Sequence, residues 1–211
     1  MRLIDTHSHL FLEEFSEDLP QVIERARSAG ITHIFMPNID STTIDSMLSV
    51  CNAYKDYCFP MIGLHPTSVN ADYEKELEIV ARELKSFNKY IAIGEIGMDL
   101  YWDKTFLKEQ QIALDKQINW ALEYDLPVVI HCRDAFDYIY NVLEPYKNTS
   151  LKGIFHSFTG TDDEAARILE FSGFLIGING VVTFKKSHLP EVLTKIPLEK
   201  IVLETDSPYL T

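Results

Sequence analysis

The sequence contains few cysteines and no long apolar segment. Its three cysteines, Cys51, Cys58 and Cys132, are an odd number and too few for a disulfide framework, so we expect a reducing, cytoplasmic setting. No apolar stretch approaches the roughly 18 residues of a membrane-spanning helix. The first residues, Met-Arg-Leu-Ile-Asp, lack the apolar core of a signal peptide. We therefore expect no association with a membrane.

Positive charge is also scarce. The 19 lysines and arginines stand against 32 aspartates and glutamates, which gives a formal net charge of −13. Such a surface repels phosphate backbones on average, and this excludes a protein that coats nucleic acid without specificity. It still allows a local site for anions, above all one that carries bound metal ions. The bulk charge alone does not decide the substrate.

The sequence also lacks the marks of a second domain. It has no linker rich in proline, glycine or serine, no low-complexity tract and no block of like charge. Of its 211 residues, 46% are hydrophobic and 24% are charged, which is ordinary globular composition. We therefore expect residues 1–211 to form one domain with a sizeable core.

Short apolar runs and amphipathic stretches alternate along the chain. The runs are typical of buried strands and cover Leu3–His9, His33–Ile39, Phe59–His65, Tyr90–Glu95, Pro127–His131, Gly153–Phe158, Phe174–Asn179 and Ile201–Asp206. The stretches are typical of helices and cover Leu19–Ala29, Thr43–Tyr54, Tyr73–Phe87, Phe106–Tyr124, Ala135–Tyr146, Asp162–Phe171 and Leu189–Lys195.

Strict alternation of strands and helices indicates an α/β protein with a parallel sheet. Eight units of about 26 residues fit a (β/α)8 TIM barrel. An open doubly wound sheet also alternates, but the sequence has no GxGxxG or Walker signature to support it. The chain stops at Thr211, five residues after the eighth run. We therefore expect a barrel that lacks its last helix and exposes an apolar flank there.

Potential metal ligands follow the expected strands. Residues i and i+2 of a strand share a face, so Asp5, His7 and His9 of the motif DTHSHL are expected to point the same way. An H-x-H motif alone is weak evidence for a metal site. Four further residues strengthen it, because they end other apolar runs or lie near their ends: Glu95, His131, His156 and Asp206. A parallel barrel gathers these strand ends at one mouth, so we expect a shared metal site there.

Without Asp5, six potential ligands remain: His7, His9, Glu95, His131, His156 and Asp206. They exceed the need of one catalytic metal ion, for which three protein ligands and water suffice. Two divalent ions bridged by Glu95 would use all six. Two ions about 3.5–4 Å apart stabilise the attacking and leaving oxygens in phosphoester or amide hydrolysis. The ligand types do not identify the metal, so Mg2+, Mn2+ and Zn2+ all remain candidates.

Six sequence blocks, in order, carry a resemblance to a known family: DTHSHL, IGLHP, IGEIGMD, VIHCRDA, FHSFTG and LETDSPYL. The chain resembles the TatD-type metal-dependent hydrolases, amidohydrolase-superfamily barrels known chiefly as DNases with 3′-exonuclease activity. The resemblance implies that one metal ion is held by His7, His9, Glu95 and Asp206. It implies that a second is held by Glu95, His131 and His156, and that His65 lies at the active site. Family members continue past the eighth strand with a basic segment and a final helix, which this sequence does not show.

Three residues are candidates for catalysis: Asp206, Glu95 and His65. We expect a water molecule activated by the two ions to attack phosphorus in a phosphodiester, with Asp206 accepting its proton. Asp206 could instead serve as a metal ligand alone. His65 would orient the phosphate or protonate the leaving oxygen, unless it is only a turn histidine before Pro66.

Substrate contacts are expected at the same mouth. Arg133 could bind a phosphate group with two parallel hydrogen bonds, or it could form a surface salt bridge with Asp134 or Asp137. Tyr101 and Trp102 could stack on a nucleic-acid base, or they could simply cap the rim of the barrel.

The sequence thus predicts a metal-dependent hydrolase, foremost a monomeric DNase. An amide or ester hydrolase, such as a deacylase of aminoacyl-tRNA, would use the same metal ligands. A barrel that holds metal without catalysis is a third hypothesis, against which the complete set of ligands argues.

Overall fold

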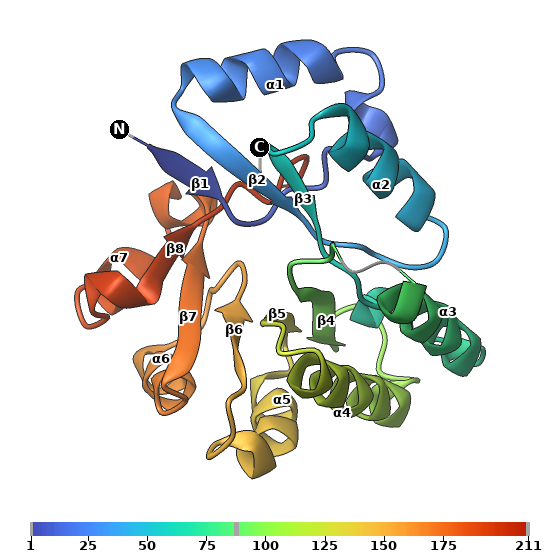
Figure 1. The fold of residues 1–211 in the computed structure, drawn as a ribbon. Helices are drawn as coiled ribbons and strands as arrows, with labels where there is room; N and C mark the ends of the chain where they lie inside the picture. Colours follow the sequence, from blue (N-terminus) through green and yellow to red (C-terminus); the bar gives the residue numbers. More distant parts are fainter. Residues whose placement is uncertain (1, 87–88, 210–211) are drawn as a thin grey trace.

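Strands and helices alternate in the computed structural model, which describes residues 2–86 and 89–209 (Figure 1). The strands in these ranges are β1 (Leu3–Asp5), β2 (Ile31–Met36), β3 (Cys58–Pro60), β4 (Ile93–Asp99), β5 (Val128–Arg133), β6 (Lys152–Phe155), β7 (Gly173–Ile178) and β8 (Ile201–Leu203). The α-helices are α1 (Leu19–Ser28), α2 (Ile44–Ala53), α3 (Tyr73–Ser86), α4 (Leu107–Glu123), α5 (Phe136–Leu143), α6 (Asp162–Leu169) and α7 (Leu189–Leu193). Each α-helix joins two consecutive strands, so the predicted alternation is confirmed.

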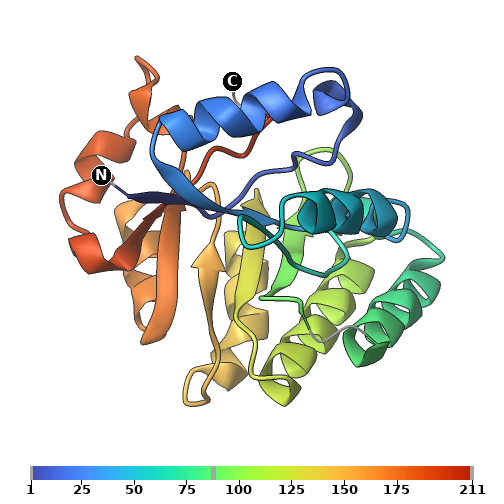
Figure 2. The same cartoon turned by 45° about the horizontal axis from the view of Figure 1, so that its top comes forward.

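All paired strands are parallel. β1 to β3 form one sheet and β4 to β8 form another, both in chain order. Isolated parallel bridges join the two sheets at both ends, from Ile62 to Ile93 and from Ser8 to Ser207. Figures 1 and 2 show the strands on the inside and the helices around them. The fold is therefore the (β/α)8 barrel that the sequence predicts, with the carboxyl ends of the strands at one mouth.

The strands are apolar because both of their faces are buried. Helices cover the outer face, and the inner face packs inside the barrel. In β5, Val128, Val129 and Ile130 are all buried, as expected for a strand with both faces covered. The helices are amphipathic, and in α1 Ile23 is buried while its charged neighbours Glu24 and Arg25 are exposed. Burial of these apolar side chains fixes the barrel that carries the site.

Several strands end earlier than the apolar runs suggest. β1 ends at Asp5, β3 at Pro60 and β8 at Leu203, so the residues that follow them are loops. These loops are still held in place, since the Asp206 amide donates a hydrogen bond to the carbonyl of His7 over 2.9 Å. The helices match the expected stretches closely, although the expected end of the third helix, Phe87, lies outside the described residues.

The fourth strand corrects one expectation. It was expected to end at Glu95, but β4 continues to Asp99, so the placement of Glu95 at a strand end is wrong. All of β4 is buried, and both acidic side chains lie inside the protein. Gly97 has a φ of +139°, and a Cβ atom there would overlap the carbonyl of His131 on β5. Glycine at this position lets β4 approach β5 closely enough to bring Glu95 to His131.

The outer face of β1 and β8 carries exposed apolar side chains. Ile4 is 43% exposed and Leu203 is 53% exposed. Within the described ranges no helix follows β8, so the expected apolar flank is present. In those same ranges, none of the helices combines the length and the apolar character needed to cross a membrane.

Candidate metal centre

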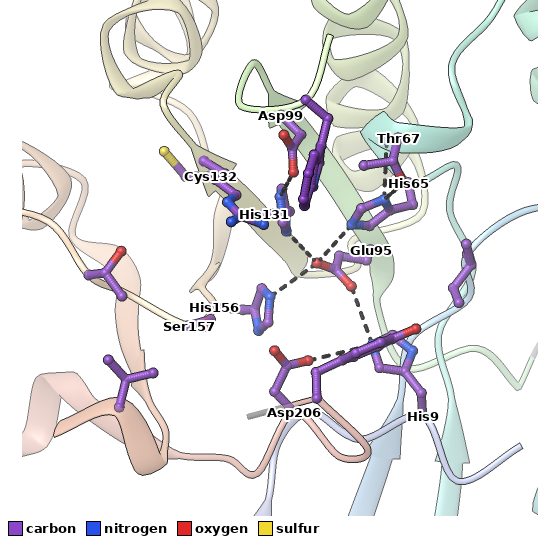
Figure 3. A pocket seen from close by; sticks show the side chains of 16 residues that line it. His9, His65, Thr67, Glu95, Asp99, His131, Cys132, His156, Ser157 and Asp206 are labelled. Carbon is purple, nitrogen blue, oxygen red and sulfur yellow. Dashed lines mark hydrogen bonds and ion pairs between the residues drawn. The ribbon is translucent and has the colours of Figure 1, made fainter. Parts of the chain in front are cut away.

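Three imidazoles surround one oxygen of the buried side chain of Glu95 (Figure 3). The Oε1 atom lies 3.0 Å from Nδ1 of His131, 3.1 Å from Nε2 of His156 and 3.3 Å from Nε2 of His65. His131 comes from β5, His156 directly follows β6, and His65 follows β3 by five residues. Residues from four parts of the barrel thus meet at one carboxylate oxygen.

The other oxygen of Glu95 faces the histidines of the motif DTHSHL. Its Oε2 atom lies 3.1 Å from Nε2 of His7 and 3.7 Å from Nε2 of His9. The Oδ1 atom of Asp206 completes this group, at 3.7 Å from both imidazole nitrogens. The six potential ligands named from the sequence therefore lie in one cluster with Glu95 at its centre.

Asp5 connects the two loops that carry this second group. Its carboxylate accepts hydrogen bonds from the backbone amides of His7 and Thr205 and from the Thr205 hydroxyl, over 3.2, 3.0 and 2.7 Å. Asp5 is therefore a buried link between the loop after β1 and the loop that holds Asp206, not a member of the cluster itself.

Sequence reasoning missed two carboxylates behind the histidines. Asp99 Oδ2 lies 2.9 Å from Nε2 of His131, on the side of the ring away from Glu95. Glu204 Oε1 lies 3.4 Å from Nδ1 of His156 and accepts a hydrogen bond from the amide of Ser157. Carboxylates in this position hold metal-binding histidines in one orientation. The sequence signal that could have identified them is their spacing from predicted ligands. Asp99 lies four residues after Glu95, and Glu204 lies two before Asp206.

The residues present fit divalent metal ions. Among the described residues, ligand atoms within 4.8 Å of one another occur in three groups: His7, His9 and Glu95; His7, His156 and Asp206; and His65, Glu95 and His131. The rings of His7 and His156 are stacked with their centroids 3.6 Å apart, and both side chains are buried. Buried imidazole and carboxylate ligands of this kind suit transition-metal ions such as Zn2+ and Mn2+.

Charge in the cluster is balanced between carboxylates and histidines. Burial alone would raise the pKa of Glu95, but His156, His7 and His65 hold the pKa of this carboxyl well below its usual range. Burial would lower the pKa of His156, whereas Glu95 and Glu204 raise it well above its ordinary value. The site therefore attracts positive charge, and metal ions would compete there with protons on histidine.

The cluster lies at the bottom of a cavity of about 720 Å³. Arg133, at the end of β5, lines this cavity together with Trp102 and Tyr209. The Arg133 guanidinium carbon lies 3.8 Å from the centre of the Tyr101 ring and 5.4 Å from that of Trp102. Trp102 is 74% exposed, so a flat group entering the cavity can reach it. The salt bridge from Arg133 to Asp134 or Asp137 does not form among the described contacts, and Asp137 instead binds Arg167.

A family model decides the relationship of the chain to known proteins. The model described as TatD related DNase matches residues 4–211. The chain belongs to this family. It is thus a TatD-family hydrolase, and the resemblance stated from its motifs is confirmed.

Individual TatD relatives match almost the whole chain. An uncharacterized metal-dependent hydrolase, YabD of Bacillus subtilis, is 36% identical over 210 residues, covering 99% of this chain and 81% of the relative. A protein named 3′-5′ ssDNA/RNA exonuclease TatD, from Pantoea ananatis, is 32% identical over 210 residues, covering 99% and 80%. The solved structure of the Escherichia coli TatD homologue YjjV superimposes with a TM-score of 0.91 at 33% identity, covering 99% of this chain and 80% of that one.

Proposed function

We propose that this TatD-family hydrolase is a nuclease that removes nucleotides from the 3′ end of single-stranded DNA with the help of two divalent metal ions. One observation carries the proposal: the carboxylate of Glu95 lies between two groups of ligands, with Oε1 facing His131 and His156 and Oε2 facing His7. Relatives named as ssDNA/RNA exonucleases match 99% of the chain.

Two sets of residues would hold the ions, and Glu95 belongs to both. The first set is His7, His9, Glu95 and Asp206, and the second is Glu95, His131 and His156. Bound Mg2+, Mn2+ or Zn2+ would supply Lewis acidity, which lowers the pKa of water and stabilises the charge that develops on the phosphate. Asp99 lies 2.9 Å from Nε2 of His131 and Glu204 lies 3.4 Å from Nδ1 of His156, where each would hold its imidazole in one orientation.

Asp206 would accept the proton of the attacking water. Its carboxylate lines the cavity and lies within 3.7 Å of both His7 and His9. Its side chain is 13% exposed, so it can be reached from the cavity while its position stays fixed. A general base needs this combination of access and fixed geometry.

His65 would donate a hydrogen bond from Nε2 to the phosphate and so orient it. Its Nδ1 accepts a hydrogen bond from the amide of Thr67 over 3.2 Å. The ring proton of the neutral form therefore sits on Nε2, which points to the Glu95 carboxylate at 3.3 Å. His65 therefore caps the turn Pro66–Ser68 through Nδ1 and also offers Nε2 as a hydrogen-bond donor at the cavity.

Arg133, Tyr101 and Trp102 would contact the substrate. Stacking on Tyr101 fixes the guanidinium of Arg133 at the cavity, where it could bind a phosphate group. The exposed ring of Trp102 could stack on a base. Tyr209, which sequence reasoning did not single out, lines the cavity next to His9 with ring centroids 5.6 Å apart and offers a second surface for stacking.

We propose a monomer of one barrel domain that works in the cytoplasm, where its three free cysteines would stay reduced. A deacylase of aminoacyl-tRNA would use the same ligands, and no separate feature of the site favours it.

The test is a cleavage assay on a 5′-labelled single-stranded DNA. Metal-free protein is incubated with Mg2+, Mn2+ or Zn2+ in turn. We expect a ladder that shortens from the 3′ end, its loss in Glu95→Ala, and its retention in the matched control Glu199→Ala, which changes an exposed glutamate that does not line the cavity. Hydrolysis of an aminoacyl ester without cleavage of DNA would overturn the proposal in favour of the deacylase.

A further inference from the structure

Two buried glutamines of α4 bind the backbone of the barrel in the same way. Gln117 accepts a hydrogen bond from the Leu64 amide over 2.7 Å and donates one to the Leu64 carbonyl over 3.3 Å. Gln110 accepts from the Asp99 amide over 3.0 Å and donates to the Asp99 carbonyl over 3.2 Å. The two glutamines are seven residues apart, so they lie on one face of the helix. Both are at least 96% buried.

These hydrogen bonds lie beyond the point where the chain after β3 bridges to β4. β3 ends at Pro60, and the bridge to β4 joins Ile62 to Ile93. Further along β4, the carbonyl of Gly94 and the amide of Glu95 bond to Asn38 instead. The amide and carbonyl of one strand residue point to the same side, so a glutamine side chain can satisfy both as a neighbouring strand would.

Leu64 and Asp99, whose backbone groups the two glutamines bind, both adjoin the metal centre. Leu64 directly precedes His65, whose Nε2 lies 3.3 Å from Glu95. Asp99 holds His131 through its side chain, and its Oδ1 accepts a hydrogen bond from the amide of Tyr101 over 3.1 Å. Each glutamine therefore fixes the backbone beneath a different part of the site.

We infer that Gln117 and Gln110 are positioning residues of the catalytic site, with Gln117 setting the place of His65 and Gln110 setting that of Asp99 and, through it, His131. This inference rests on the proposed function for its catalytic readout. The hydrogen bonds themselves are independent of that function, because they lie between α4 and the barrel backbone.

The test for Gln117 compares Gln117→Leu with Gln111→Leu. Gln111 is a half-buried neighbour on the same helix whose side chain forms no hydrogen bond with a described residue. We expect Gln117→Leu to lower kcat about 10- to 100-fold, as a small displacement of a catalytic group does, with the affinity for Mn2+ unchanged. In a His65→Ala background the same change should cost nothing further, because the two residues then act through one group.

The test for Gln110 is the affinity for metal. We expect Gln110→Leu to weaken Mn2+ binding about 10-fold or more, as loss of an outer hydrogen bond to a ligand does, and to have no added effect in Asp99→Ala. Should either leucine variant fail to fold, Gln110→Met or Gln117→Met replaces it, since methionine fills the same space without the amide.

A readout independent of activity separates this inference from the proposed function. Nitrogen-15 NMR of the metal-free protein reports which nitrogen of His65 carries the proton. We expect the Nε2–H form in the wild type and in Gln111→Leu, and a mixture of forms in Gln117→Leu. The inference is overturned if folded Gln117→Leu keeps the wild-type ring and kcat and loses only thermal stability. If the wild type cleaves no nucleic acid but the His65 ring still depends on Gln117, the proposed function fails and the positioning role stands.

Discussion

The Nε2 atoms of His7 and His9 lie 3.2 Å apart, and both side chains are buried. Only one proton can lie between two such nitrogens, and the Nδ1 atoms of both rings have no hydrogen-bond partner among the described residues. Glu95 and Asp206 bring negative charge to the same point. This arrangement is unfavourable for an empty site and favourable for a cation, which joins the four side chains into one stable group.

Metal should therefore stabilise the fold. A ligand at 100 times its Kd adds about 2.7 kcal/mol to the free energy of unfolding, which for a chain of this size raises Tm by about 5–10 °C. Differential scanning fluorimetry of metal-stripped protein, before and after addition of Mn2+ or Zn2+, measures this shift. The shift should shrink in His7→Ala. An unchanged Tm at saturating metal would argue against a built metal centre.

Arg133 should contribute to binding of the substrate more than to the chemical step. Arg133→Ala is expected to raise KM for single-stranded DNA about 10- to 100-fold with a small change in kcat, since a charge-assisted hydrogen bond contributes about 1.5–3 kcal/mol. Arg133→Lys should recover only part of the loss, because lysine cannot form the two parallel bonds. Steady-state kinetics of both variants are compared with Lys185→Ala, a lysine that does not line the cavity. A fall in kcat alone would contradict this role.

Cleavage should depend weakly on salt and on the length of the DNA. Among the described residues that line the cavity, Arg133 is the one lysine or arginine, and the net charge of the chain is −13. One phosphate contact on a single strand gives a slope of about −0.7 in a plot of log kcat/KM against log salt, or a roughly threefold loss between 50 and 200 mM. We also expect similar KM values for short and long oligonucleotides. A slope steeper than about −3 would show an extended phosphate-binding surface instead.

High pH should destabilise the protein through its buried thiols. Burial raises the pKa of Cys58 to about 12 and also raises that of Cys51. From about pH 9 upward the unfolded chain releases protons that the folded chain retains, so stability falls by up to about 1.4 kcal/mol per pH unit and thiol until the pH reaches the folded pKa. Urea unfolding of wild type and Cys58→Ala from neutral to alkaline pH measures the decline. The decline should be shallower in the variant, and equal slopes would be evidence against this origin.

The ring of strands and the clustering of the histidines and carboxylates could be predicted because both leave local patterns. Apolar runs that end in histidine or a carboxylate are visible in the sequence, and parallel topology brings their ends together. The same kind of local pattern gave the wrong position for Glu95 within its strand. A polar residue after an apolar run indicates a strand end, whereas β4 continues for four buried residues to Asp99. The interior of a barrel near its mouth can hold acidic residues when histidines face them.

The supporting contacts could not be predicted, because they join distant parts of the chain. Gln117 and Leu64 are 53 residues apart, and Ser157 and Glu204 are 47 apart. A single glutamine on the buried face of a helix has no periodic signature. Its role depends on where β3 happens to end, which only the folded structure reveals.

The proposed nuclease site would hold two metal ions around Glu95. Its most direct test is a titration of metal-free protein, at a concentration well above the Kd, with Mn2+ while the rate of cleavage of single-stranded DNA is followed. We expect no cleavage without metal and a rate that rises until two equivalents of Mn2+ are bound per chain. Full cleavage in the presence of a chelator, or a rate that saturates at one equivalent, would contradict it.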